Sequence, residues 1–513
     1  MQMTMFAAIE VGSYSIRLEI FEVSKQKGIS SLDMVMHRME LGKSTFATGK
    51  ITPDLVEELC TVIQDFKNIM DGYQVEAYRA FATSAVREAK NNLIVLEVIY
   101  QRTGIRVDVL SNSEQRFMVY KGIASKESTF QKIIEKGTAI LDVSGGSIQV
   151  SLFDKDSLIV TENVKLGSLR VRERLHGIEN TTTHYEVLVE ELIRNEVANF
   201  KKMHLKDRKI TNVILVGNHF TDSILYRKEG VRSKNISQEE YMEWYQMVIS
   251  NSPIELAMKM EIPLEYASLM IPTAIINKRL IQEMEAESIW TPGVSLADGF
   301  VYDYAIRNKY IKPVHDFEQD IVMASQNIGR RYAVGKSHTL MMNGAAKTIL
   351  DAMKKRHGLS SREKLLLEVA INLHDCGKYI SLGNVAECSF NIIMSTEIIG
   401  LSHREREIIA NVVKYNTKHF GDYEEVNRST ALKTKDYVLV ARLTALLRLV
   451  NALDQGHMQK TEGLKAVVRG QELVLTIETN KDFNLEYAML HDKADFFEEV
   501  YNIRPVLKIK KKM

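Results

Sequence analysis

Two short Gly/Ser turns, each between apolar stretches that pattern as β-strands, constrain this chain more than any other feature. The first lies in Glu10–Leu18, which reads EVGSYSIRL, and the second lies in Leu141–Phe153, which reads LDVSGGSIQVSLF. Two such turns that face each other bind phosphate oxygens through their backbone N–H groups. Glu10 and Asp142 precede the turns, where they are placed for a metal ion or a water molecule. The pattern predicts a protein built around phosphate.

The length and composition limit the classes to which this protein can belong. The 513 residues predict about three or four domains at ~100–200 residues each, and 45% hydrophobic content is ample for buried cores. No apolar run approaches the ~18–20 residues of a membrane span, and the N-terminus lacks the pattern of a secretory signal. The three cysteines have unrelated spacings, which excludes a disulfide framework or a zinc ribbon. We therefore expect a cytoplasmic protein with neither a membrane nor a nucleic acid as partner.

Strand and helix patterns alternate through the first half of the chain, which is typical of an α/β fold. Apolar spacing predicts a helix over Pro53–Met70, and Ser111 is placed to cap another helix that begins near Ser113. The pattern recurs after Leu141, which suggests two similar lobes with a ligand cleft between them. The expected strands are Phe6–Glu10, Ile16–Phe21, Ala77–Ala82, Arg106–Leu110, Thr138–Val143, Ile148–Phe153, Ser157–Lys165 and Asn212–Val216.

The second half reads differently. Mostly helical patterns extend to about His457, and a short tail follows with β-rich stretches at Ala466–Ile477 and Arg504–Lys508 around a helix near Asp492–Tyr501. We therefore expect an α/β protein with two lobes, a mostly α-helical domain and a small α+β C-terminal piece. The expected boundaries are 1–124, 125–307, 308–460 and 461–513.

Six ordered motifs within residues 6–304 resemble one family, the Ppx/GppA phosphatases. These proteins are exopolyphosphatases and guanosine pentaphosphate phosphohydrolases with the actin and sugar-kinase fold, so the resemblance implies that the two lobes are actin-like. The motifs are EVGSYSIRL from Glu10, Thr83–Ala89, Ser111–Gly122, DVSGGS from Asp142, Leu166–Arg170 and Ala297–Gly299.

The resemblance also implies a site. A phosphate chain is expected between the two turns, with Arg87 as a clamp, because a planar guanidinium binds two phosphate oxygens at once. Mg²⁺ or Mn²⁺ held by Glu10 and Asp142 is expected to neutralise the phosphates while water attacks the terminal phosphorus. The residues expected to cradle the phosphates are Gly12, Ser13, Gly145, Gly146 and Ser147.

The chain departs from the family in its acids. Glu10 stands where Asp is usual, and Glu114 matches the first acid of a family pair whose second member, the catalytic base, is replaced by Gln115. Gln149 replaces a further Glu. An amide cannot take a proton near neutral pH, and general-base assistance is worth ~10²–10⁴ in rate. Two interpretations follow: an enzyme in which Glu114 orients the water, or a weakened or inactive relative that binds polyphosphate or a guanosine alarmone as a sensor.

The helical half carries a second pattern. His338, the adjacent pair His374-Asp375, and Asp454 resemble the HD superfamily over about residues 319–457, which implies a divalent metal and a second candidate for phosphoester hydrolysis. A hydrogen-bonded polar core of the same four residues is the alternative. The resemblance also implies a homodimer. As the primary function we expect removal of terminal phosphate from inorganic polyphosphate, with guanosine pentaphosphate as a second candidate substrate.

Overall fold

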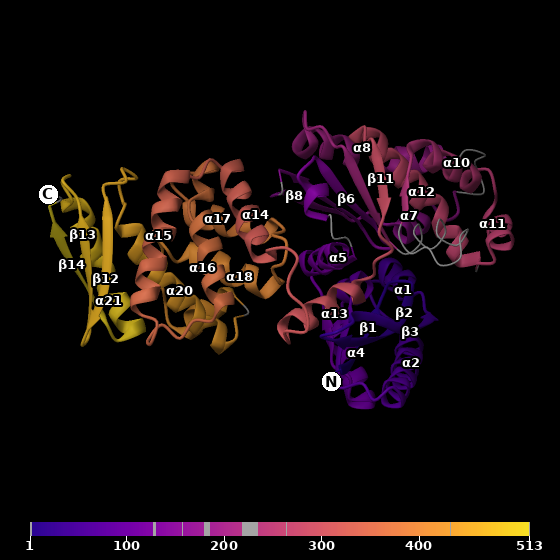
Figure 1. Cartoon of the computed structure of the whole chain (residues 1–513), viewed down its shortest axis with the longest axis horizontal. Helices are drawn as coiled ribbons and strands as arrows, with labels where there is room; N and C mark the ends of the chain where they lie inside the picture. Colours follow the sequence, from indigo (N-terminus) through magenta and orange to yellow (C-terminus); the bar gives the residue numbers. More distant parts are fainter. Residues whose placement is uncertain are drawn as a thin grey trace. The chain divides into compact units, whose positions relative to one another are not determined.

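A computed structural model describes residues 3–126, 130–155, 157–178, 185–217, 234–262, 264–430 and 432–511. The chain divides into two compact units, unit 1 up to Phe317 and unit 2 from Glu318 (Figure 1). Among the helices in these ranges, none combines the length and apolar composition needed to cross a bilayer.

Unit 1 contains two sheets with related topology, as the repeated sequence pattern predicts. The first has the strand order β3-β2-β1-β4-β5, and the second has the order β10-β11-β9-β6-β7-β8. In each lobe three consecutive strands form an antiparallel meander, and a later strand pairs in parallel with the first of the three. The strands are β1 (Met3–Val11), β2 (Ser15–Ser24), β3 (Gly28–Arg38), β4 (Ala77–Ala82), β5 (Val107–Val109), β6 (Thr138–Val143), β7 (Ile148–Asp154), β8 (Ser157–Val164), β9 (Asn212–Val216), β10 (Lys234–Ile236) and β11 (Ser288–Thr291).

Helices cover these sheets and complete a separate core in each lobe. Local signals define several ends. Pro53 occupies the first turn of α2, where its missing N–H costs nothing, and Gly49 ends α1 in the left-handed region at φ 78°. The helices of unit 1 are α1 (Leu41–Thr48), α2 (Pro53–Gly72), α3 (Ser84–Glu88), α4 (Asn92–Thr103), α5 (Asn112–Lys126), α6 (Phe130–Ile134), α7 (Ser168–Leu175), α8 (Tyr185–Phe200) with a π-helical turn at Lys201–Leu205, α10 (Gln238–Ile249), α11 (Pro253–Met260), α12 (Leu264–Met284) and α13 (Leu296–Arg307).

The last helix of unit 1 returns to the first lobe. Although α13 follows the second sheet in sequence, it packs against β1 and α5. Phe300 stacks on Phe81 with ring centroids 4.4 Å apart, and Tyr304 lies 4.7 Å from Phe6. The expected boundaries at 124 and 307 place this helix in the second lobe, so they do not follow the packing.

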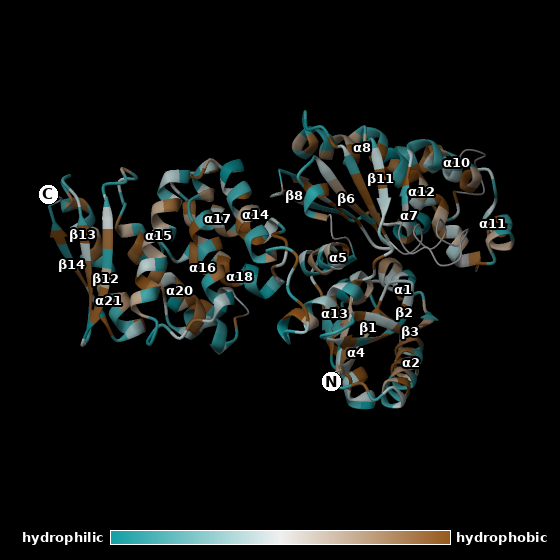
Figure 2. Ribbon diagram, viewed as in Figure 1, coloured by the Kyte–Doolittle hydropathy of each residue, from teal (hydrophilic) through white to brown (hydrophobic). Residues whose placement is uncertain are grey.

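Unit 2 begins with a helical region. α16 and α20 carry mostly buried side chains, and both show brown, apolar residues in Figure 2. The helices are α14 (Phe317–Arg331), whose first residue belongs to unit 1, α15 (Lys336–Ala352), α16 (Ser361–Leu373), a 3₁₀ turn at Cys376–Tyr379, α17 (Val385–Ser395), α18 (His403–Lys414), α19 (Tyr423–Ser429) and α20 (Thr434–Ala452).

A three-stranded sheet completes unit 2, with β13 (Glu472–Glu478) between β12 (Gly463–Arg469) and β14 (Arg504–Lys510). Helix α21 (Asn484–Tyr501) packs against β14. The β-rich stretch expected at Ala466–Ile477 is confirmed and consists of two antiparallel strands, with Gly470 at φ 60° in the turn between them.

Candidate functional site

The two Gly/Ser turns have the same local geometry. The N–H of Gly12 donates to the carbonyl of Ser15 at 3.0 Å, and the N–H of Ser144 donates to the carbonyl of Ser147 at 3.0 Å. A side chain at Gly12 would place its Cβ 2.7 Å from the Ser15 carbonyl oxygen, so the first turn requires glycine.

The lobes bring the two turns into contact. A Cβ built at Gly145 would lie 3.8 Å from the Cβ of Ser13, and one built at Gly146 would lie 2.3 Å from the hydroxyl of Ser84. The hydroxyls of Ser13 and Ser84 are hydrogen-bonded at 2.8 Å. The predicted turn residues therefore meet, and Ser84 at the start of α3 joins them. Sequence reasoning missed Ser84, although the register of β4 beside β1 places α3 next to the first turn.

Glu10 and Asp142 occupy equivalent positions just before the turns. Each is the second-last residue of its strand, β1 or β6. Burial raises the pKa of Glu10, with Arg17 opposing. Burial and the charge of Glu10 raise the pKa of Asp142 to about 6, with Arg116 opposing. Two buried carboxylates whose ionisation is penalised fit a divalent cation, which relieves both penalties.

Gln149 pairs with Asp142 across β6 and β7 and is 1% exposed. Neither its amide oxygen nor its amide nitrogen has a hydrogen-bond partner among the described residues. A cavity of about 10 Å³ adjoins it, which is roughly the smallest space that holds one water molecule. The side chains around the cavity are Arg116, Val119, Tyr120, Ile140, Asp142, Gln149 and Ser151.

The start of α5 holds Glu114 and Gln115. The carboxylate of Glu114 accepts from the N–H of Ser111 at 2.9 Å, and the N–H of Glu114 donates to the Ser111 hydroxyl at 3.2 Å. This reciprocal pair is a capping box, so Ser111 caps the helix as predicted. Gln115 is buried. The structure therefore gives Glu114 a local role, and its orientation of water stays a prediction.

Arg87 also bonds to this segment. Its guanidinium donates to the carbonyl of Leu110 at 2.6 Å and to the side-chain oxygen of Asn112 at 2.5 Å. These bonds link α3 to the start of α5. The expected phosphate clamp by Arg87 stays a prediction as well.

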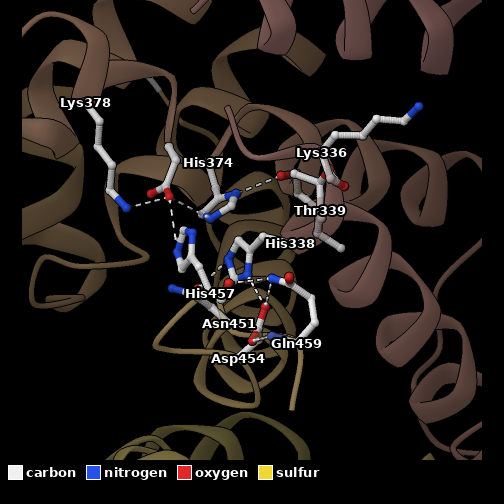
Figure 3. Close-up of polar contacts among 11 residues, drawn as sticks. Lys336, His338, Thr339, His374, Lys378, Asn451, Asp454, His457 and Gln459 are labelled. Atoms are coloured by element: carbon white, nitrogen blue, oxygen red, sulfur yellow. Dashed lines mark hydrogen bonds and ion pairs between the residues drawn. The ribbon is translucent and has the colours of Figure 1, made fainter. Parts of the chain in front are cut away.

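The four residues singled out in the helical half lie together in unit 2, and Figure 3 labels three of them, His338, His374 and Asp454. Ligand atoms of His338, His374 and Asp375 all lie within 4.8 Å of one another, close enough for one metal ion to contact all three. Asp454 has a supporting position, because it pairs with Nδ1 of His338 at 2.8 Å and accepts from the N–H of Gln459 at 2.7 Å.

The tautomer of His374 is fixed by the backbone. Its Nδ1 donates to the carbonyl of Ile371 at 2.8 Å, so the lone pair of the neutral ring is on Nε2. That Nε2 lies 3.4 Å from the carboxylate of Asp375 and has no hydrogen-bond partner among the described residues. Burial opposes the charge of Asp375, but Lys378, whose ammonium lies 2.6 Å from the carboxylate, helps to hold its pKa below the usual range.

His457 completes the cluster, and sequence reasoning missed it as a member. Its ring stacks on His338 with centroids 3.7 Å apart, and its Nε2 lies 3.6 Å from Asp375. Burial lowers the pKa of both histidines, which favours neutral rings that are able to bind a metal. His457 follows α20 at φ 53°, in a turn whose path no periodic pattern predicts.

Comparisons with known proteins agree with the motifs. The sequence model described as the Ppx/GppA phosphatase family matches residues 20–308, and the model described as Ppx/GppA phosphatase, domain III, matches residues 323–495.

Curated relatives carry phosphatase names. A guanosine-5'-triphosphate,3'-diphosphate pyrophosphatase of Photobacterium profundum is 20% identical over 92% of this chain and 91% of that protein. Exopolyphosphatase 2 of Mycobacterium tuberculosis is 26% identical over 34% of this chain and 57% of that protein. A bifunctional 3-dehydroquinate synthase/phosphatase of Fusobacterium nucleatum is 20% identical over 48% of this chain, and the match spans only 38% of its length.

Solved structures share the fold of unit 1. An exopolyphosphatase from Cytophaga hutchinsonii superposes with a TM-score of 0.53 at 17% identity, covering 60% of this chain and 98% of that one. An Aquifex aeolicus protein of the Ppx/GppA family gives a TM-score of 0.51 at 19% identity, covering 60% and 99%. The prediction of two actin-like lobes is confirmed.

Proposed function

The chain belongs to the Ppx/GppA phosphatase family, and we propose that it removes the terminal phosphate of inorganic polyphosphate between its two Gly/Ser turns. The observation that carries the proposal is the apposition of the turns above the buried acids Glu10 and Asp142. Guanosine pentaphosphate is a second candidate substrate, supported by the name of the Photobacterium relative. A homodimer in the cytoplasm belongs to the same proposal, and light scattering of the purified protein tests the dimer.

The chain's own residues supply binding and orientation. Backbone N–H groups of Ser13, Gly145 and Gly146 donate to phosphate oxygens. The hydroxyls of Ser13 and Ser84 are bonded to each other, so one of the two keeps its O–H for a further bond to phosphate. Glu10 and Asp142 would hold Mg²⁺ or Mn²⁺, which when bound neutralises the phosphate oxygens.

Activation of the water is the weak part of this site. Gln115 and Gln149 replace acids, and Glu114 is shared with the cap of α5. Because a missing general base costs about 10²–10⁴ in rate, we expect slow turnover with intact binding.

The test is phosphate release from long-chain polyphosphate with Mg²⁺ or Mn²⁺, with binding measured on the same samples of wild type, Gln115→Glu and Glu114→Gln. We expect measurable wild-type turnover, an increase in Gln115→Glu and a loss in Glu114→Gln with binding retained. Binding without turnover in the wild type, and activity only in Gln115→Glu, would establish a sensor of polyphosphate or an alarmone. Absence of both binding and turnover in all three proteins rejects the proposal.

A second candidate function is favoured by one observation, the lone pair of His374 that faces the carboxylate of Asp375. Two acceptors at this distance repel unless a proton or a cation lies between them. We propose that His338, His374 and Asp375 would hold a divalent metal, with His457 beside them, and that this supports metal-dependent phosphoester hydrolysis.

Metal content separates this candidate from a polar core. Purified wild type is expected to retain about one Mn²⁺, Fe²⁺ or Zn²⁺ after dialysis, and the double variant His374→Ala, Asp375→Ala is expected to retain none. If the double variant keeps full phosphatase activity, the helical unit is not the catalyst. If wild type binds none of the three metals, the cluster is a hydrogen-bonded core.

A further inference from the structure

One arginine joins the second Gly/Ser turn to the first lobe. Arg170, in the first turn of α7, donates from Nε to the carbonyl of Gly146 at 3.1 Å. Its Nη2 donates to the carboxylate of Glu88 at 2.8 Å, and its guanidinium carbon lies 4.0 Å from the centroid of the Phe46 ring. The guanidinium therefore lies at the phosphate turn and contacts the opposite lobe.

These contacts fix the plane of the guanidinium. The Arg170 side chain is 14% exposed, so its charge is largely removed from water and depends on Glu88, which is 25% exposed. Within the described residues, Nη1 of Arg170 has no hydrogen-bond partner. The Nε side of the guanidinium is therefore bonded to the turn, and Nη1 is available to donate to an oxyanion.

The carboxylate of Glu88 is an anionic hydrogen-bond acceptor for Arg170, as a phosphate would be. Carboxylate and phosphate oxygens both accept charge-assisted hydrogen bonds from a guanidinium. Arg87, by contrast, donates to Leu110 and Asn112, and none of these contacts involves a turn. Arg170 is therefore better placed than Arg87 to contact a ligand at Gly146.

Entry of a phosphate chain between the turns must disturb the Glu88 pair. Ser84 and Gly146 are already in contact, so a chain that enters there separates α3 from the second turn. Glu88 lies at the end of α3 and moves with it, whereas Arg170 is bonded to the turn. Separation therefore leaves the guanidinium beside the ligand and withdraws its carboxylate partner.

We propose that Arg170 is an anion-binding residue of this cleft, and that Glu88 is a built-in competitor that holds its guanidinium until a phosphate chain replaces it. The inference deepens the proposed function and rests on it for the position of the ligand. It requires no hydrolysis, so it holds for an enzyme and for a sensor.

The chain provides matched controls. Arg174 lies on the same helix, is exposed and has no ion-pair partner among the described residues, so Arg174→Gln removes the same charge without touching the turn. Arg172 donates to Glu40 across the lobes at 3.2 Å, and Glu40 is 25% exposed, as Glu88 is. Glu40→Gln therefore loosens the lobes to a similar degree while leaving Arg170 and Glu88 paired.

The experiment is calorimetric titration of tripolyphosphate into each full-length protein, once with Mg²⁺ and once with EDTA, after thermal melts show that the variants are folded. Arg170→Gln is expected to raise the Kd for tripolyphosphate about tenfold or more. The Kd of Arg170→Lys is expected to lie between that of Arg170→Gln and that of the wild type. Glu88→Gln is expected to lower Kd about two- to fivefold, with Arg174→Gln and Glu40→Gln near the wild type.

Each result has a distinct meaning. Unchanged affinity in Arg170→Gln overturns the anion-binding role while leaving the proposed function intact. Equal gains in Glu88→Gln and Glu40→Gln would mean that the pair only latches the lobes, which overturns the competition. If the Kd values of the variants change as expected but no protein releases phosphate, hydrolysis is rejected and the anion-binding role of Arg170 stands. Failure of every protein to bind under both conditions rejects this inference and the proposed function together.

Discussion

The two lobes of unit 1 repeat one hairpin but differ in its electrostatics. In the first lobe Glu10 pairs with Arg17 across β1 and β2, and in the second lobe Asp142 pairs with Gln149 across β6 and β7. Two residues further along, Glu19 in the first lobe corresponds to Ser151 in the second.

The first lobe therefore sets a buried cation, Arg17, directly across the strand pair from its acid. The second lobe sets an amide without a partner among the described residues in that position, and the cation that opposes the raised pKa of Asp142 is Arg116 of α5. The same turn geometry is compatible with both arrangements. The backbone of the duplicated hairpin thus specifies the phosphate cradle, and the side chains beneath it decide separately how each acid is used.

Removal of the first-lobe cation is expected to have the largest effect. Arg17→Met leaves Glu10 and Glu19 without their buried positive neighbour and is expected to cost about 3–5 kcal/mol. Urea unfolding followed by circular dichroism measures the loss, because Trp244 and Trp290, the only tryptophans, both lie in the second lobe and do not report on the first lobe by themselves. A loss below about 1 kcal/mol would contradict the proposed compensation.

The pH dependence of stability comes next. Burial and Asp298 raise the pKa of Glu19 to about 7, with the Ser295 hydrogen bond and Arg17 opposing. Because the folded pKa lies above the unfolded value, this group's contribution is complete below about pH 4.5 and is lost as pH rises through 7. Glu19→Gln removes that dependence, so its stability relative to wild type is expected to rise by about 3 kcal/mol between pH 4.5 and 8. Parallel pH profiles of the two proteins would reject the shift.

Substitution of a glycine tests the contact between the lobes. In Gly146→Ala the new Cβ meets the hydroxyl of Ser84 at 2.3 Å and its Cβ at 2.8 Å, so overpacking of about 1–3 kcal/mol is expected. Gly72→Ala is the control, because nothing lies within 4 Å of its new Cβ. If thermal melts show both variants to be equally stable, the second turn is not in contact with Ser84 of α3 in solution.

The smallest effect is expected for the amide of the second lobe. Gln149→Leu removes two polar atoms that lack partners among the described residues, so its stability is expected within about 1 kcal/mol of wild type or above it. The same urea experiment measures the change. A loss of 2 kcal/mol or more would indicate a water molecule bound to Gln149 in the adjacent cavity, and the two lobes would then be equally well compensated.

Much of the fold follows from apolar periodicity. β4, β6 and β9 match the expected strands residue for residue, because each is a short run of apolar residues flanked by polar ones. β3 was not expected, because its alternation exposes Leu32, Met34 and Met36 on the outer side of an edge strand, so no polar face marks the period. The sequence predicts β-structure over Ala466–Ile477 but not its division into β12 and β13, because Gly470 alone marks the turn.

The site was less accessible to sequence reasoning. The structure brings Ser13, Gly145 and Gly146 to one interface, as expected for two turns that face each other, and their contact with phosphate stays a prediction. The sequence does not predict the roles of Ser84, Glu88 and His457, because their contacts depend on how separate elements pack against one another. Glu114 shows the converse: a side chain with a motif-based role also serves the cap of its own helix.

The packing of α13 against the first lobe has a consequence for the synthesis of this protein and for the choice of recombinant fragments. The first lobe consists of two stretches of chain separated by the whole second lobe, and Phe6 and Phe81 are covered only once Phe300 and Tyr304 have been synthesised. A ribosome must translate the second lobe before the first can close. A recombinant fragment that stops near residue 124 would present that aromatic face to solvent and aggregate, so an expressible piece of unit 1 must extend beyond Arg307.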